Sequence, residues 1–214
     1  MVRVAHIALA SLAIAVPLAA KVPSDRLSET IFEQGCVTRF YGVPLNLKLS
    51  ELEALDVDYT RGFVSGEGDY YPAATLLVGR NVLLQAEFNT DEVPTLYQLT
   101  TSSAGAIGPG GVAIGSTLRD VRRKWPKGKF YWASAHGPYV AFTNGTNVYF
   151  EFDPREMPPG AFDPPPVPVQ DASGKWVSPP RTKVVPDPIK LKVRSIRISN
   201  GNIFESCKKP DGKK

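Results

Sequence analysis

The amino-acid sequence predicts an α+β fold, built from short helices and antiparallel strands. Three observations support this prediction: two similar segments with helical spacing, a strand–turn–strand pattern after each, and a third strand candidate after each hairpin. A short amphipathic helix needs a sheet to cover its apolar face, and an antiparallel sheet with one solvated face accepts it. We therefore expect duplicated helix-and-hairpin units that form two small antiparallel sheets or one merged sheet.

The chain begins with a segment typical of an export signal, residues 1–20. A basic start at Arg3 precedes an apolar stretch that ends in small residues, which is the pattern of a signal peptide. We expect cleavage after Ala20, with Ala15 as a second candidate position, and an uncleaved membrane anchor is the alternative. The expected location is the periplasm or the outside of the cell.

Composition and cysteine content agree with an exported globular protein. Hydrophobic residues make up 43% of the chain, and 20 prolines and 18 glycines favour many turns. A formal net charge of +4 is mild, so no nucleic-acid partner is implied. In an oxidising compartment the two cysteines, Cys36 and Cys207, favour a disulfide that ties the two ends of the mature domain together. Two free thiols are the alternative.

The first unit, residues 21–104, begins with a predicted helix over residues 24–34. Ser24 is a candidate cap, Leu27 and Ile31 share one helix face, and Gly35 ends the helix.

An internal duplication relates this unit to the second unit, residues 105–207. The segment 42–53 aligns without gaps on 111–122, and each reads Gly-Val, an apolar residue, a polar turn and a short helix. The apolar positions of each helix are three residues apart and share one face. These positions are Leu49 and Leu52 in the first copy and Leu118 and Val121 in the second, where Ser116 and Thr117 are candidate caps.

A hairpin and a third strand follow each copy. Residues 75–78 and 81–89 form the first predicted hairpin, and its third strand covers 95–101. In the second copy, Asn144-Gly145 is a strong hairpin signal between two strand candidates. The strands of the second copy cover residues 139–143, 146–153 and 191–199.

A proline-rich insertion, residues 154–188, interrupts the second copy and holds 11 of the 20 prolines. Proline has no amide donor, so this segment cannot form a central strand. Residues 167–177 predict a hairpin that turns at Asp171-Ala172-Ser173-Gly174, and the remainder reads as a polyproline-like loop. Trp176 and Phe162 suggest a docking surface, and packing over its own domain is the alternative. We expect the tail, residues 208–214, to be disordered.

The sequence shows no convincing catalytic, metal or cofactor site. Outside the signal segment the single histidine is His136, in a turn-like stretch, and no Gly-x-Ser-x-Gly elbow occurs. The spacing of Asp56, Asp58, Thr60 and Glu67 approximates a calcium loop but lacks its glycine. Residues 108–113 approximate a phosphate-binding glycine loop, but the hairpin-rich context argues against it, and a linker between the copies explains the glycines better. We therefore expect no catalytic residues, no metal and no cofactor, with a hydrolase of unrecognised site as an alternative.

Candidate binding residues are basic and aromatic. A basic cluster around Trp125 and Trp132 could meet anionic lipid or acidic glycans, although a solvated helix face is the simpler explanation. Aromatic anchors commonly dominate protein interfaces. The basic cluster comprises Arg119, Arg122, Arg123, Lys124, Lys127 and Lys129, and the aromatic candidates are Tyr70, Tyr71, Trp132, Tyr139, Tyr149 and Trp176.

The motif Gly115-Ser116-Thr117-Leu118-Arg119-Asp120-Val121, followed by two hairpin strands, resembles the repeat of β-lactamase inhibitory protein. It also resembles the SmpA/OmlA-type outer-membrane assembly lipoprotein, although this chain has no lipidation cysteine near the cleavage point. The resemblance implies an exported, non-enzymatic α+β protein that binds another protein, often through an open sheet face. We expect an envelope or secreted protein as the partner, and a binder of anionic lipid or glycan is the alternative.

Overall fold

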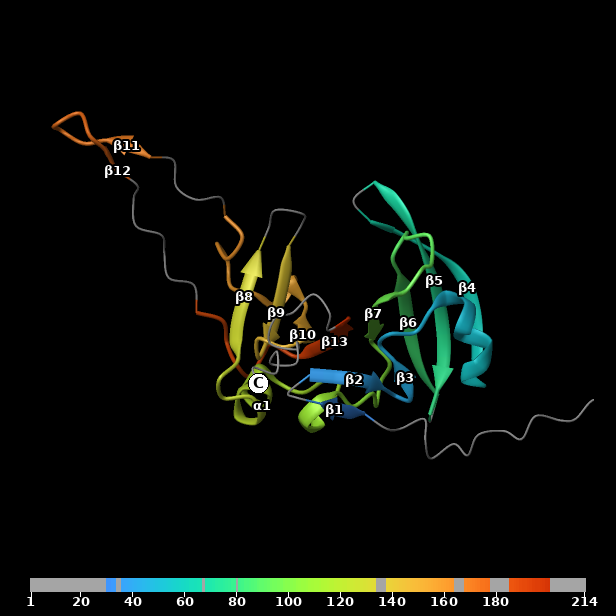
Figure 1. Cartoon of the computed structure of the whole chain (residues 1–214). Helices are drawn as coiled ribbons and strands as arrows, with labels where there is room; N and C mark the ends of the chain where they lie inside the picture. Colours follow the sequence, from blue (N-terminus) through green and yellow to red (C-terminus); the bar gives the residue numbers. More distant parts are fainter. Residues whose placement is uncertain are drawn as a thin grey trace, which may run out of the picture.

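An eight-stranded antiparallel sheet dominates the computed structural model (Figure 1). The structure describes residues 30–33, 36–66, 68–79, 81–133, 138–163, 168–177 and 185–200. The strand order of the large sheet is β4-β5-β6-β7-β13-β10-β9-β8. Its strands are β4 (Asp58–Gly66), β5 (Asp69–Val78), β6 (Val82–Phe88), β7 (Leu96–Thr101), β8 (Lys129–Ala133), β9 (Tyr139–Thr143), β10 (Val148–Phe152) and β13 (Val193–Ser199).

The large sheet consists of two halves of four strands, which meet where β7 pairs with β13. Strands β4 to β7 lie on the right in Figure 1, and β8, β9, β10 and β13 lie on the left. Leu99 of β7 pairs with Ile198 of β13, and Thr101 pairs with Ile196, so the ladder continues across the junction. The hairpins expected from the sequence are present as β5–β6 and β9–β10, and the third strands are β7 and β13.

Helical structure is short among the described residues. These helical segments are α1 (Leu118–Lys124) and the 3-10 turns η2 (Leu49–Leu55), η3 (Pro109–Gly111) and η4 (Pro154–Glu156). Thr117 caps α1 as predicted, because its hydroxyl accepts a hydrogen bond from the Asp120 amide (3.2 Å) and the Asp120 carboxylate accepts one from the Thr117 amide (3.1 Å).

The predicted α+β class is therefore wrong, and the described chain is mainly β. The spacing of apolar residues indicated the two short helices correctly, but each spans seven residues and one is a 3-10 turn. The stretches that became β4 and β8 carried no strand prediction, although they form both edges of the large sheet. β4 pairs with β5 and β8 pairs with β9, in each case the next strand along the chain. β4 is an edge strand that is mostly exposed, so its sequence lacks the regular apolar alternation that would have predicted a strand.

One hydrophobic core lies against a single face of the large sheet. Alternate residues of its strands point to this face, among them Leu84 of β6, Leu99 of β7 and Ile196 of β13, all with no exposed surface. The short helices and the small N-terminal sheet cover them. The covering side chains include Leu52, Leu118, Val121, Val37, Phe40 and Val43.

The small sheet contains β1 (Ile31–Glu33), β2 (Cys36–Phe40) and β3 (Val43–Pro44), in that order. The helix predicted over residues 24–34 is therefore wrong at its C-terminal end, where β1 pairs antiparallel with β2. Two apolar residues at helical spacing are a weak signal, and pairing with β2 outweighs it. The earlier part of that prediction, residues 24–29, lies outside the described part of the chain, as do Gln34 and the expected stop at Gly35.

A buried asparagine joins the small sheet to the large one. The side chain of Asn147 has no exposed surface, and its Oδ1 accepts a hydrogen bond from the Val37 amide (3.0 Å). Its Nδ2 donates to the carbonyl oxygens of Val37 (2.8 Å) and Ser199 (3.0 Å). Asn147 therefore holds β2 against the end of β13, and buried polar groups are kept satisfied in this way.

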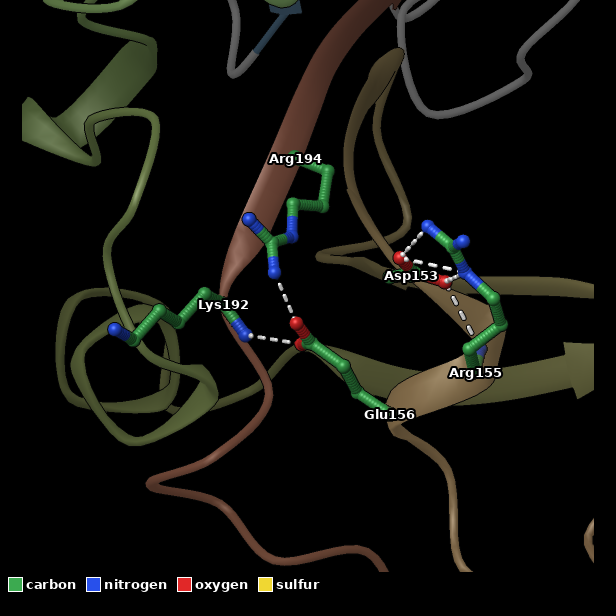
Figure 2. Close-up of polar contacts among 5 residues, drawn as sticks. All are labelled: Asp153, Arg155, Glu156, Lys192 and Arg194. Carbon is green, nitrogen blue, oxygen red and sulfur yellow. Dashed lines mark hydrogen bonds and ion pairs between the residues drawn. The ribbon is translucent and has the colours of Figure 1, made fainter.

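The base of the insertion is closed by charged contacts (Figure 2). Glu156 accepts a hydrogen bond from the Lys192 amide (3.2 Å) and forms an ion pair with Arg194, so the two ends of the insertion meet. Asp153 accepts hydrogen bonds from the amide and guanidinium of Arg155. The Arg155 hydrogen bonds hold the pKa of the Asp153 carboxyl at about 2.

The insertion combines a packed part with an exposed hairpin. Ala161 and Phe162 pack against the core of their own domain. The predicted hairpin is present as β11 (Val169–Gln170) and β12 (Trp176–Val177), and it lies away from the sheets in Figure 1. The Asp171 carboxylate accepts hydrogen bonds from the Ser173 amide (2.9 Å) and the Lys175 amide (3.1 Å), which stabilises the expected turn.

Several sequence-based expectations concern positions outside the described residues: the signal segment 1–20, Glu67, His136, Cys207 and the tail 208–214. Cys36 itself is buried on β2.

Within the described ranges, no helix has both the length and the apolar character needed to cross a membrane.

Candidate functional site: the open face of the sheet

The second face of the large sheet is not covered by the core-forming helices and the small sheet. Successive side chains of a strand point to opposite faces, so the residues that alternate with the buried ones along each strand lie on this second face. The pairs Gln85–Thr100 and Glu87–Gln98 lie on this face, as does Arg197 opposite Thr100. We call this surface the open face, and its central residues are Tyr71, Gln85, Glu87, Tyr97, Gln98, Thr100, Tyr131, Tyr139, Tyr149, Glu151, Ser195 and Arg197.

An arginine sits among tyrosines in the second half of the open face. The Arg197 guanidinium carbon lies 4.7 Å from the ring centroid of Tyr149 and 5.3 Å from that of Tyr139. Its Nε is 3.0 Å from Glu151 Oε1, without the alignment of a hydrogen bond, and its Nη2 donates to the Tyr139 hydroxyl. We call Tyr131, Tyr139, Tyr149, Glu151, Ser195 and Arg197 the arginine–tyrosine cluster.

Glu151 organises the polar contacts of this cluster. The Tyr139 hydroxyl donates to Glu151 Oε1 (3.0 Å), and the Ser195 hydroxyl donates to Glu151 Oε2. Burial and the neighbouring Glu151 carboxylate raise the pKa of Tyr139 far above its ordinary value. Burial, with Tyr131 nearby, also raises the pKa of Tyr149. Both phenols therefore stay neutral at physiological pH and keep their O–H donors.

A pocket of about 760 Å³ occupies the first half of the open face, between β4 and β7. Its walls carry two tyrosines, Tyr71 and Tyr97, together with two acidic residues, Glu87 and Asp91. Phe88 also contributes to the lining, although it has no exposed surface and belongs to the core. We call it the β4–β7 pocket. Its remaining lining residues are Val64, Ser65, Gly66, Gln85, Asn89 and Thr90.

The loop at one end of the pocket is held in place by Asn89. The Asn89 side chain accepts a hydrogen bond from the Thr95 amide (2.8 Å) and donates to the Thr95 hydroxyl (3.0 Å) and the Asp91 carboxylate (2.5 Å). The Asn89 amide also donates to the Thr95 carbonyl (2.9 Å). A loop fixed by its own hydrogen bonds loses less entropy when a ligand binds.

The basic residues predicted for binding lie on and after α1, away from this site. Arg119, Arg122, Arg123 and Lys124 are exposed. Arg123 pairs with Asp120 (3.0 Å), and the Arg122 guanidinium carbon lies 5.9 Å from the Phe130 ring centroid. Arg122 and Arg123 therefore already make contacts within the chain.

The predicted aromatic residues separate into three environments. Tyr71, Tyr139 and Tyr149 lie on the open face. Trp132 faces the core side, where its indole N–H donates to the Ala161 carbonyl (2.8 Å). Trp176 is 66% exposed on the insertion hairpin, and Tyr70 is 74% exposed near the β4–β5 turn. The structure thus brings Tyr139 and Tyr149 together but keeps Trp132 and Trp176 apart from them.

Close packing explains two of the three glycines at 108–111, Gly108 and Gly110. A Cβ on Gly108 would approach the Ile196 side chain within 3.0 Å, and one on Gly110 would lie 3.0 Å from the Trp125 indole nitrogen. Gly110 also has a positive φ of 70°, which favours glycine. Within the described residues, no group of three or more His, Cys, Asp or Glu is arranged to hold a metal ion.

Sequence reasoning missed Arg197, Glu151, Glu87 and Tyr97 as parts of one surface. A signal was present in β10 and β13, where polar residues alternate with buried ones such as Phe150 and Ile196. That alternation indicates a solvated face, but it does not show which strands become neighbours. The pairing of β7 with β13, which places both halves on one surface, is a tertiary result.

Comparisons with known proteins identify no family. No family model matches the chain, and no curated protein matches it. The chain is similar to a solved structure of the uncharacterized protein YfeY from Escherichia coli, with 14% sequence identity and a TM-score of 0.42. The match covers 72% of this chain and 90% of YfeY.

Proposed function

We propose that this chain is an exported, non-enzymatic protein-interaction module of the periplasm or cell envelope, which binds another protein on its open face. The observation that carries the proposal is the arginine–tyrosine cluster beside the β4–β7 pocket. Tyrosine and arginine are enriched among the residues that dominate binding energy at protein interfaces. The cluster presents both residue types on regular strands, which position side chains more rigidly than loops do.

The internal contacts of the cluster suit recognition of a protein surface. Glu151 and the two tyrosines hold the guanidinium of Arg197 in one orientation before any partner arrives. Binding then costs little side-chain entropy, because the rotamers are already restricted. Tyrosine supplies apolar area together with a hydroxyl that tolerates partial exposure.

Binding of anionic lipid or glycan through α1 is the competing proposal. It predicts an electrostatic interaction that weakens strongly with salt, because exposed charges are screened. The exposed basic residues Arg119 and Lys124 would contribute to it.

Site-specific photocrosslinking in the producing cells separates the two proposals. A photoreactive phenylalanine derivative replaces Tyr97 on the open face in one variant and Lys124 on α1 in another. The interaction module predicts one defined protein adduct from position 97 and none from position 124. The adduct should weaken when Arg197→Gln is added, with circular dichroism confirming that this variant folds.

Two results would contradict the proposal. The first is the absence of any protein adduct from position 97. The second is a lipid or glycan adduct from position 124 that disappears at high salt, which would support the competing proposal.

A further inference from the structure

We propose that the β4–β7 pocket binds a basic side chain of the partner, a lysine ammonium or an arginine guanidinium. This inference rests on the proposed function and specifies what the partner presents to one part of the open face. It follows from the charge, the aromatic walls and the volume of the pocket.

The charged residues that line the pocket are both acidic. Glu87 Oε2 accepts a hydrogen bond from Gln98 Nε2 (2.8 Å), and Asp91 Oδ2 accepts one from Asn89 Nδ2 (2.5 Å). These neutral donors orient the carboxylates without neutralising them. Among the described residues, the ion pairs involve neither Glu87 nor Asp91, and no basic residue lines the pocket.

Aromatic side chains in the pocket lining also favour the binding of a cation. The rings available for such a contact are those of Tyr71 and Tyr97, which both line the pocket. The face of an aromatic ring attracts an ammonium or guanidinium group, and the attraction grows when water is displaced. The long aliphatic part of lysine or arginine can pack on the rings while its charged end reaches a carboxylate.

The size of the pocket suits a long basic side chain, and its charge disfavours an anionic or a neutral apolar group. Its volume of about 760 Å³ accommodates a long side chain together with neighbouring atoms of a peptide. An anionic group would be repelled by both carboxylates. A neutral apolar group would remove water from Glu87 and Asp91 without replacing their hydrogen bonds, which is costly.

A peptide titration followed by NMR tests the inference on the folded chain. The probes are acetyl-Gly-Lys-Gly-amide, its arginine analogue and its norleucine analogue, in which an uncharged aliphatic chain replaces lysine. We expect saturable shifts of the Tyr71 and Tyr97 ring signals with the two basic peptides, at millimolar affinity. The norleucine peptide should bind about tenfold more weakly or not at all.

A charge-neutral variant of the pocket provides the second part of the test. The double substitution Glu87→Gln and Asp91→Asn should weaken lysine-peptide binding about tenfold, because both carboxylates are removed. Glu92→Gln is the matched control, since Glu92 is exposed and does not line the pocket. Equal binding of the norleucine peptide, unchanged binding by the double variant, or no saturable shift with either basic peptide would each overturn the inference.

The two proposals fail in distinguishable ways. If the position-97 adduct forms but no basic peptide binds, the inference is wrong and the interaction module stands. If a basic peptide binds the pocket but no protein adduct forms, the proposed function is wrong.

Discussion

Replacing the buried Asn147 with alanine tests the polar contact between the two sheets. The substitution removes three hydrogen bonds: one from the Val37 amide, one to the Val37 carbonyl and one to the Ser199 carbonyl. A hydrogen bond contributes about 1 kcal/mol net, and an unsatisfied buried partner costs more. Asn147→Ala should therefore lower the free energy of unfolding by about 3 kcal/mol.

Urea denaturation, followed by tryptophan fluorescence, measures this free energy. For a domain of this size, about 3 kcal/mol corresponds to a fall in Tm of about 6–12 °C. Asn46→Ala is the control, because Asn46 is exposed in a turn, and its effect should stay within about 0.5 kcal/mol. A loss below about 1 kcal/mol for Asn147→Ala, with an unchanged denaturant slope, would refute the reasoning that these bonds join β2 to β13.

Three further predictions concern packing, charge and the cysteines. Gly128→Ala should lower the free energy of unfolding by about 1–3 kcal/mol in the same assay, because the new Cβ would lie 2.3 Å from the Phe142 ring. Gly62→Ala is the control and should be nearly neutral, because no atom lies within 4 Å of its Cβ position. Arg155→Gln should raise the pKa of Asp153 from about 2 toward its ordinary 3.8 in a carboxyl NMR titration. Because that pKa is lowered in the folded state, its contribution to stability is present above about pH 4 and is lost as the pH falls toward about 2. The protein isolated without reductant should show no reactive thiol when denatured, and Cys36→Ser should expose one thiol at Cys207. A reactive thiol in the unsubstituted protein would disprove the predicted disulfide.

The chain between Ser199 and Cys207 is long enough to allow this disulfide. The Asn147 side chain donates hydrogen bonds to the carbonyl oxygens of Val37 and Ser199. Val37 directly follows Cys36, and Ser199 is the last residue of β13. Cys207 follows Ser199 by eight residues, which span at most about 26–29 Å when extended. The pairing stays a prediction, because Cys207 lies outside the described residues.

The amino-acid sequence by itself determined the local elements. Strand–turn–strand patterns predicted both hairpins, Thr117 was a predicted cap of α1, and the residues from Asp171 to Gly174 specified the insertion turn. These signals are local because they depend on side chains a few residues apart. The turn chemistry and the capping bonds need no distant partner.

The tertiary structure alone decided the fold class and the candidate site. The β7–β13 ladder merges two hairpin groups into one sheet, and it sets Arg197 and Thr100 side by side although they are far apart in the sequence. Strand pairing also turns weakly patterned stretches into β4 and β8 and replaces a predicted helix end with β1. Such pairing depends on which strand edges meet in space. The alternation of residues along one strand does not show which strand will pair with it. The open face, with its arginine–tyrosine cluster and acidic pocket, is a product of that choice.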